Sequence, residues 1–459
     1  MPKPAHPVPQ SSSLLLRILS LIPHRLSLFL FLLTPNPSSL SAEPYLSGGT
    51  VPFTAEQQAV LDRHREILSL GVNRDWLAES HIDIDAYMGA LDLIAESVKR
   101  GEVPGAVVLV DRYGTKVFPA AVGYLMTDPQ PWKAKYDTQY YLQDLTGPVA
   151  TVPLIVKLWS EGKLSISERV ERRLPELAGS PLGALRIESL MRHTSGLPEN
   201  YDSEPFMSDE EMFAALAKIP LETPGTAVRK SPLNFLVLGL IAERAGGKPL
   251  ETQAQESFPL YFRDGLLTYR ANPARRQYIA PGEYSSAIGR LAWAEPTDPF
   301  GIHKVPNAGH TGLIASADEI SVPARALLAM AEVRLKAADF FTTGPLVEVL
   351  LPDRNISGGE TMGLGYEVGR FGPTSFGWDS PSGCSIWLLP EQRGFIVYLS
   401  NRDHPAGVGV DRPDPRDVAL PLLARALGWV GSPVDTPSEG LHPNEPLPTR
   451  PPDSPPAVP

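Results

Sequence analysis

The stretch YYLQDLTGPVATVPLIVKLWSEGKL, residues 140–164, decides how the rest of the chain is arranged. Its second half carries apolar residues at helical spacing, which predicts a helix over residues 149–161. Thr146 is a candidate N-cap, and Pro148 would fall in the first turn, where a missing N–H costs little. Pro153 lies further inside and should kink the helix or restart it.

The elements on either side of this helix indicate an α+β fold. We expect helices and strands in the following order: helices at 56–70 and 83–99, a β-hairpin at 105–123, strands at 385–389 and 395–399, and a closing helix at 418–429. Strands and helices near both ends predict an antiparallel sheet flanked by N- and C-terminal helices, in which the two ends of the chain meet. The middle should form a mostly helical second lobe.

Composition excludes several classes of function. The 459 residues are 42% hydrophobic and 20% charged, as in an ordinary globular protein. A formal net charge of −11 disfavours nucleic acid as a partner, because a basic patch supplies most of that affinity. Nine His with no HxxxH pair and one Cys make a metal site improbable, and no Gly-rich phosphate loop occurs, so no cofactor is expected. Cys384 lies in a predicted strand and should be buried.

The two termini differ in character from the body of the chain. Basic residues precede an apolar run at 27–33, and small polar residues follow it up to Ala42, so residues 1–42 are predicted to be an export signal. The run is too short to span a membrane, so no span should remain after cleavage. Residues 43–84 are expected to be an extension with one helix. Residues 431–459 contain ten Pro and are predicted to be a disordered tail.

Four further segments identify a family resemblance. They are HTSGLP (193–198), PGT (224–226), NAGHTGLIASADEI (307–320) and GFIVYLSNRDHP (394–405). In this order and spacing the chain resembles the β-lactamase and penicillin-binding-protein family, which includes class C β-lactamases and related esterases. The resemblance covers about residues 103–430 and implies a β-lactamase-like domain at 85–430. It also implies acyl transfer through a serine ester, which needs a nucleophile, a base and an oxyanion hole.

The family's first motif, S-x-x-K, places a nucleophilic serine and a lysine one helical turn apart. The resemblance puts Asp144 at the serine and Gly147 at the lysine of that motif. A carboxylate is a poor acyl nucleophile, and Gly147 has no side chain. The second motif, Tyr-x-Asn, falls on Lys230 and Pro232, of which Pro232 offers no side-chain hydrogen bond.

The third motif, Lys- or His-Thr-Gly, falls on Trp378, Asp379 and Ser380. The next residue donates an oxyanion-hole N–H in the family, but here it is Pro381, which has none. Losing one such donor typically costs ~10²–10³ in rate. We call these eight residues, from Asp144 to Pro381, the motif positions and interpret them as vestigial, with no catalytic residue expected.

Three apparent motifs elsewhere are interpreted as structural. His310-Thr311-Gly312 resembles the third motif but precedes a helical run rather than a strand and the closing helix. Ser160 and Lys163 form a literal S-x-x-K at the end of a helix, and Ser195 lies in a predicted loop.

Two consequences for the site follow. The serine and tyrosine oxygens of the family lie within hydrogen-bond reach, so their replacements Asp144 and Lys230 are predicted to form an ion pair. Two separately solvated charges remain the alternative. Trp378 is expected to occupy part of the cleft, because an indole is larger than the Lys or His it replaces.

The sequence therefore predicts an exported, periplasmic or extracellular protein that has lost catalysis and binds a peptidoglycan fragment or an envelope protein. One alternative is an active serine-type hydrolase, such as an esterase, D-amino-acid peptidase or β-lactamase-like enzyme, that uses non-standard residues. The other is an interaction protein that recruits partners through its Pro-rich tail. The oligomeric state is left open.

Overall fold

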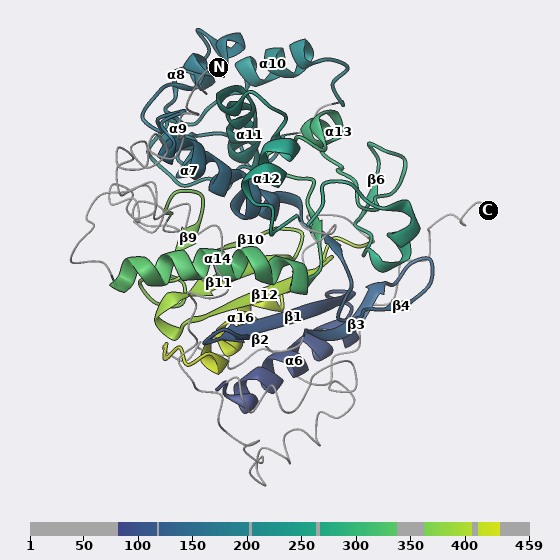
Figure 1. Cartoon of the computed structure of the whole chain (residues 1–459). Helices are drawn as coiled ribbons and strands as arrows, with labels where there is room; N and C mark the ends of the chain where they lie inside the picture. The colour runs from purple at the N-terminus through teal and green to yellow at the C-terminus, as the bar shows by residue number, and fades with distance from the viewer. Residues whose placement is uncertain are drawn as a thin grey trace, which may run out of the picture.

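Antiparallel pairing brings the two ends of the described chain together. The computed structural model describes residues 81–116, 119–201, 204–262, 267–336, 362–405 and 412–431. Strand β1 (Gly105–Arg112) pairs along its length with β12 (Gly394–Ser400), in a register that runs from Ala106 opposite Ser400 to Arg112 opposite Gly394. The predicted meeting of the chain ends in one sheet is confirmed (Figure 1).

Eight described strands form the main sheet, in the order β4-β3-β1-β12-β11-β10-β9 with β2 paired to β1. The strands besides β1 and β12 are β2 (Thr115–Lys116), β3 (Ala120–Met126), β4 (Trp132–Lys133), β9 (Glu367–Val368), β10 (Phe376–Asp379) and β11 (Ser385–Leu389). All the pairings are antiparallel. The predicted hairpin and C-terminal strand pair are both present.

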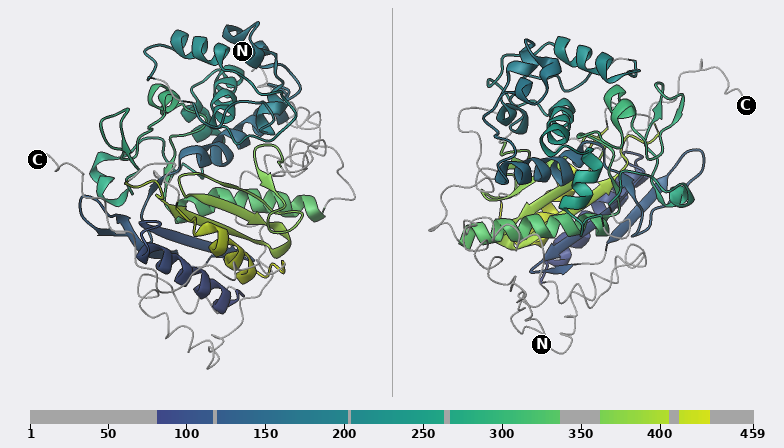
Figure 2. Two further views of the ribbon diagram at one scale, coloured as in Figure 1. Left: turned by 180° about the vertical axis from the view of Figure 1, so that it is seen from behind. Right: turned by 45° about the horizontal axis from the view of Figure 1, so that its top comes forward.

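Both faces of this sheet are covered by helices. Ala106, Val108 and Val110 share one core with the terminal helices α6 (Ile84–Lys99) and α16 (Arg416–Ala426), which pack on each other. Figure 2 shows α6 and α16 side by side from behind. The alternate residues of β1, Val107 and Leu109, belong to a second core that includes α14 (Ala317–Lys336). The central strand is therefore apolar on both faces.

The middle of the chain forms the mostly helical second lobe that was predicted. Its helices are α7 (Val152–Ser160), α8 (Pro181–Ala184), α9 (Ile187–Met191), α10 (Asp209–Lys218), α11 (Pro232–Gly246), α12 (Leu250–Ser257) and α13 (Pro299–Lys304). Two short strand pairs complete it: β5 (Tyr140–Tyr141) with β8 (Ile314–Ala315), and β6 (Tyr284–Ser285) with β7 (Arg290–Leu291). Helix α11 is buried from Leu233 to Ala242 and forms the centre of the lobe.

The helix that was predicted over residues 149–161 begins in irregular turns rather than as a regular α-helix. Residues Gln143–Leu145 form a 3₁₀ turn, Gly147–Thr151 form a π-helical turn, and the regular helix begins only at Val152. The restart near Pro153 is as predicted. Thr146 occupies the N-cap position of the π-helical turn, but its side chain makes no capping hydrogen bond: its Oγ1 instead accepts a hydrogen bond from the backbone N–H of Leu313, at 3.2 Å. The Thr146 side chain therefore bonds to the backbone of the loop before β8 and not to the N–H groups of its own helix.

Several predictions concern parts of the chain that the structure does not describe. The export signal at 1–42, the helix at 56–70 and the tail from residue 432 onward lie outside the described residues. Within the described ranges, no helix has the length and apolar character needed to cross a membrane. Cys384 is fully buried, as predicted.

Arg416, at the start of α16, fixes the turn between β10 and β11. Its guanidinium donates to the carbonyl oxygens of Ser380 and Cys384, at 2.8 and 3.2 Å, and to Ser385 Oγ at 3.0 Å. It also forms an ion pair with Asp414 at 2.6 Å. The closing helix is thereby tied to the strand that carries the third motif.

Replacing Arg416 by Met should lower the free energy of unfolding by about 3 kcal/mol, because it removes the main cationic partner of the Asp414 carboxylate and one of the donors to each of the two carbonyls. The matched control is Arg425→Met, on an exposed position of the same helix, where a change within about 0.5 kcal/mol is expected. Urea unfolding of both variants measures the difference. Equal losses in the two would show that Arg416 does not have this role.

Candidate functional site

A cavity of about 780 Å³ lies where segments distant in the sequence converge. Its lining includes residues from 140–144, from 226–232 ahead of α11, from 379–382 after β10 and from 400–403 after β12. Five motif positions contribute to it: Asp144, Lys230, Pro232, Asp379 and Pro381. The three sequence motifs therefore do meet around one cavity.

An aromatic cluster of His193, Phe235 and Trp378 lies next to this cavity. The ring centroids are 4.8 Å apart for His193 and Phe235, 4.9 Å for His193 and Trp378, and 5.1 Å for Phe235 and Trp378. Trp378 is 1% exposed, and its Nε1 donates to Asp144 Oδ2 at 3.4 Å. Trp378 thus points from β10 toward Asp144 and packs into the core. It was expected to occupy part of the cleft, but it is not part of the described cavity lining.

Gly147 has no room for a side chain. A Cβ added at this position would lie 2.4 Å from two carbon atoms of the Phe235 ring, well inside van der Waals contact. Phe235 is itself fully buried, so its ring cannot swing into solvent. The space toward which a residue at 147 would project is filled by the aromatic cluster.

The predicted ion pair between Asp144 and Lys230 is wrong. Lys230 Nζ pairs with Glu367 Oε1 at 2.9 Å and also lies over the Trp378 ring, 5.6 Å from its centroid. Glu367 lies on β9, directly opposite Gly377 of β10, which brings its carboxylate to the same edge of the site. Lys230 therefore has a nearer carboxylate than Asp144.

Asp144 is buried with few compensating contacts. Burial raises the pKa of its carboxyl, and hydrogen bonding from Ser380 and Trp378 and the charge of Lys230 offset this only in part. Its Oδ1 has no hydrogen-bond partner among the described residues. A buried carboxylate with an unpaired oxygen is costly, so this group demands an explanation.

The remaining motif positions are held by structural contacts. Asp379 Oδ1 accepts from Trp387 Nε1 at 2.8 Å, and Arg370 pairs with the same carboxylate. Burial opposes the charge of Asp379, but Arg370 and Arg416 outweigh it and lower its pKa.

Two further motif positions, Ser380 and Pro232, stabilise local structure. Ser380 Oγ lies 2.8 Å from Ser382 Oγ, and Pro232 is the first residue of α11, after the N-cap Ser231.

Sequence reasoning missed most of the carboxylates that line the cavity. Seven are present: Asp144, Glu199, Glu283, Glu295, Asp298, Asp379 and Asp403. His310, which we interpreted as structural, also lines the cavity, and its Nε2 lies 3.0 Å from Asp298 Oδ1. Most of these residues come from loops without a periodic pattern, so no sequence signal indicated that they converge.

Asp403 is the most perturbed of these carboxylates. It is 4% exposed and accepts a hydrogen bond from Gln143 Nε2 at 2.8 Å. Burial, with repulsion from Glu283, raises the pKa of Asp403 to about 6. Gln143 has a φ of 47°, a left-handed conformation that is uncommon outside glycine. Gln143 directly precedes Asp144 in the sequence, so its hydrogen bond holds Asp403 close to the segment that carries Asp144.

The described residues contain no group of three or more His, Cys, Asp or Glu side chains arranged to hold a metal ion. The titratable side chains of the cavity lining are carboxylates together with His310, Arg229, Lys230 and Arg416 and two tyrosines.

Comparison with known proteins shows to which family this fold belongs. The model of the family described as "Beta-lactamase" matches residues 91–420. The chain belongs to the beta-lactamase family. This confirms the resemblance stated from the sequence, and the family consists of serine hydrolases such as carboxypeptidases, esterases and β-lactamases.

Relatives and solved structures agree with this assignment. The chain is 27% identical over 349 residues to "Putative D-alanyl-D-alanine carboxypeptidase" of Escherichia coli K12, covering 66% of this chain and 77% of that protein. It is 26% identical to "Esterase EstB" of Burkholderia gladioli, over 63% of this chain and 80% of the relative. A class C β-lactamase structure superposes with a TM-score of 0.57 at 18% identity, over 74% of this chain and 96% of that one. The β-lactamase-like α+β fold is thus confirmed.

In this family member, replacing Gly147 by Ala should lower the free energy of unfolding by about 2 kcal/mol, because overpacking a dense core costs about 1–3 kcal/mol. Gly89, in the middle of α6, is the matched control: an added Cβ would be 3.9 Å from its nearest neighbour, Leu422 Cδ1. Gly89→Ala should raise the free energy of unfolding by about 0.5–1 kcal/mol. Chemical denaturation of both variants should give opposite signs, and a shared sign would contradict the contact with Phe235.

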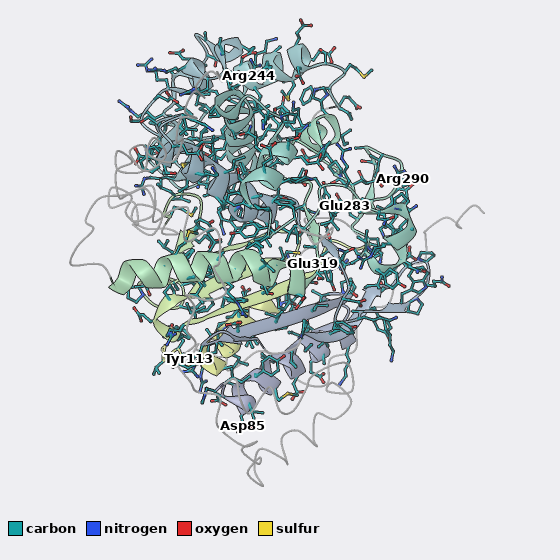
Figure 3. All side chains as sticks on the ribbon, in the orientation of Figure 1. Asp85, Tyr113, Arg244, Glu283, Arg290 and Glu319 are labelled. Carbon is teal, nitrogen blue, oxygen red and sulfur yellow. The ribbon has the colours of Figure 1, made fainter. Side chains whose placement is uncertain are left out.

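Replacing Asp403 by Asn should stabilise the protein at neutral pH. An aspartate near pKa 3.9 when unfolded and about 6 when folded binds more protons in the folded state, so its favourable contribution is complete below about pH 4 and is lost as pH rises through 6. The variant should gain up to about 3 kcal/mol at pH 7 and little at pH 4. Melting temperatures between pH 4 and 8 test this, with Asp85→Asn, at an exposed position of α6, as control (Figure 3). A pH-independent difference would contradict the role of Asp403.

Proposed function

We propose that this member of the beta-lactamase family is an exported, non-catalytic protein that binds a ligand in the retained cavity. The ligand is a fragment of peptidoglycan or part of an envelope protein. The observation that carries the proposal is the contact between Gly147 and Phe235. It leaves no space for the lysine that the family's first motif would place beside its serine.

The other motif positions support the same conclusion. Asp144 would stand at the nucleophile, and a carboxylate attacking an acyl group gives a labile anhydride. Lys230, which could replace the motif's tyrosine as a base, is already engaged in an ion pair with Glu367 at 2.9 Å, and an adjacent carboxylate favours the charged form of an amine over the basic one. Pro381 has no N–H to donate to an oxyanion. Nucleophile, base and one oxyanion donor would all have to be supplied by other groups.

The cavity itself supports binding. A volume of about 780 Å³ lies within the range of ligand pockets, roughly 300–1,000 Å³. The relative "Putative D-alanyl-D-alanine carboxypeptidase" acts, by that name, on a peptide that ends in D-alanyl-D-alanine. The basic and apolar pattern of residues 1–42 supports export to the compartment where such fragments occur.

Covalent labelling tests the absence of acyl transfer. The purified full chain, incubated with a fluorescent penicillin or a fluorophosphonate probe, should show no mass increase and no fluorescent band. The double variant Asp144→Ser/Gly147→Lys should also remain unlabelled, because the lysine would meet Phe235. A class C β-lactamase in the same reaction serves as the positive control. Stoichiometric labelling of the unmodified chain would support the alternative of an active hydrolase and overturn the proposal.

A peptidoglycan-derived muropeptide tests directly for ligand binding. It should raise the melting temperature of the full chain without being cleaved, because a ligand that binds only the folded state stabilises it by RT ln(1 + [L]/Kd). Mass spectrometry of the recovered muropeptide distinguishes binding from turnover. Recovery of cleavage products would overturn the proposal, whatever the shift in melting temperature.

A further inference from the structure

Residues 280–296 form an arm at one side of the cavity. The arm carries the β6–β7 strand pair, and its contributions to the cavity lining include Gly282, Glu283 and Glu295. Figure 3 labels Glu283 and Arg290 on this arm. The contacts that hold the arm against the rest of the molecule therefore also hold that side of the cavity in place.

Three hydrogen bonds join the arm to the exit loop, which we define as residues 401–405 after β12. Two of them run from Asn401 Nδ2 to the Pro281 carbonyl oxygen at 2.7 Å and from the Tyr284 N–H to the Pro405 carbonyl oxygen at 3.0 Å. The third involves the side chain of His404, whose Nδ1 lies 2.9 Å from the Gly282 carbonyl oxygen. Of the three, only this last bond depends on a group that titrates near neutral pH.

The other ring nitrogen of His404 bonds to the loop that follows β3. Its Nε2 lies 3.1 Å from the backbone nitrogen of Thr127 and 3.4 Å from that of Asp128. A backbone N–H can only donate, so Nε2 must be the bare, accepting nitrogen of the ring. The carbonyl oxygen of Gly282 can only accept, so Nδ1 must carry the proton. These contacts together require the neutral Nδ1–H tautomer of His404.

A second proton on His404 is incompatible with this arrangement. It would place an N–H at Nε2 directly against two other N–H donors, and His404 is fully buried, so the charged ring cannot reach water without moving. Thr127 and Asp128 are exposed residues, so their N–H groups can bond to water once they are released. Protonation should therefore separate the ring from this loop without unfolding the sheet.

We propose that His404 is a pH-sensitive clamp: its neutral ring joins the loop after β3, the exit loop and the arm, and protonation of Nε2 opens this junction and loosens the arm beside the cavity. The proton comes from solvent, and no covalent bond of the chain changes. The inference goes beyond the proposed function and does not depend on it, because the junction would open in the same way whether the cavity binds a ligand or reacts with one.

The charges around His404 oppose its burial only in part. Burial lowers the pKa of His404, and the hydrogen bond to Gly282 and the charge of Asp128 act in the opposite direction. Further charged residues adjoin the junction, namely Arg402 and Asp403 in the exit loop and Glu283 in the arm. A histidine whose pKa is lowered by folding contributes its full stability above its unfolded value of about 6.5. That contribution is lost as pH falls through the lowered value, so the clamp should open on the acid side.

Amide hydrogen exchange on the full chain tests the clamp without any ligand. The probes are the amides of Thr127 and Asp128 and those of residues 282–292, with each rate divided by the intrinsic exchange rate at the same pH. Protection of both sets should fall at least about tenfold between pH 7.5 and pH 4.5, while protection of β1 and β12 should stay within about twofold. Unchanged protection of the loop and the arm over this range would overturn the inference.

Variants assign the effect to this ring. His404→Gln removes the titrating group, so the protection of the arm should lose its pH dependence. Asp403→Asn removes the neighbouring carboxyl, which has a pKa of about 6, and should retain the pH dependence. His303→Gln in α13 is the matched control, because its ring contacts Asp209 of α10, and it should also retain the dependence. A dependence that persists in His404→Gln, or that disappears in Asp403→Asn, would overturn the assignment.

NMR of ¹⁵N-labelled histidine provides a second readout, on the unmodified ring. At pH 7.5 the His404 signals should show a protonated Nδ1 and a bare Nε2, and the ring should titrate below about 6.5. The signals are assigned by their loss in His404→Gln, or in His404→Asn if the first variant folds poorly. A ring that carries its proton on Nε2 at pH 7.5, or that titrates above 6.5, would contradict the clamp.

The outcomes of these experiments are independent of the proposed function. Exchange and histidine titration contain no ligand, so a negative result in either would overturn the clamp and leave the proposed binding function standing. Covalent labelling by a penicillin would overturn the binding function and leave the clamp standing.

Discussion

Antiparallel pairing between β1 and β12 is the interaction on which the rest of the molecule depends. It joins segments almost 300 residues apart, so the helical lobe between them must leave and return to the same sheet. The strands beyond β12 then place β10 at a fixed distance from the lobe, and Arg416 ties that edge to the closing helix. The three motifs meet at one cavity because the sheet fixes the edge that carries the third motif relative to the lobe that carries the other two.

Beside the cavity, packed side chains occupy the space that the family resemblance assigns to catalytic residues. The Phe235 ring covers Gly147, Trp378 packs against Phe235 and donates to Asp144, and Lys230 lies over Trp378 while pairing with Glu367. Each contact depends on the next. A single substitution back toward the family motif would therefore meet an occupied space or an unpaired charge, which is why the aromatic cluster and the motif positions are best considered as one unit.

The wrong predictions have a common cause. Thr146 bonds to Leu313 rather than capping its own helix, and Lys230 pairs with Glu367 rather than Asp144. In both cases the true partner comes from a short element that has no sequence pattern of its own. The acids around Asp403 were missed for the same reason, because loop residues carry no periodicity from which their convergence can be predicted.

The sequence by itself determined the fold class, the meeting of the chain ends in one antiparallel sheet, the helical lobe and the family. These depend on hydrophobic period, turn residues and ordered motifs, which are local properties that can be counted along the chain. Only the tertiary structure decided that Phe235 fills the space beside Gly147, which carboxylate Lys230 meets, and that seven carboxylates line one cavity. Those are properties of contacts between distant residues, and their energies depend on separations of a few ångströms that no linear pattern records.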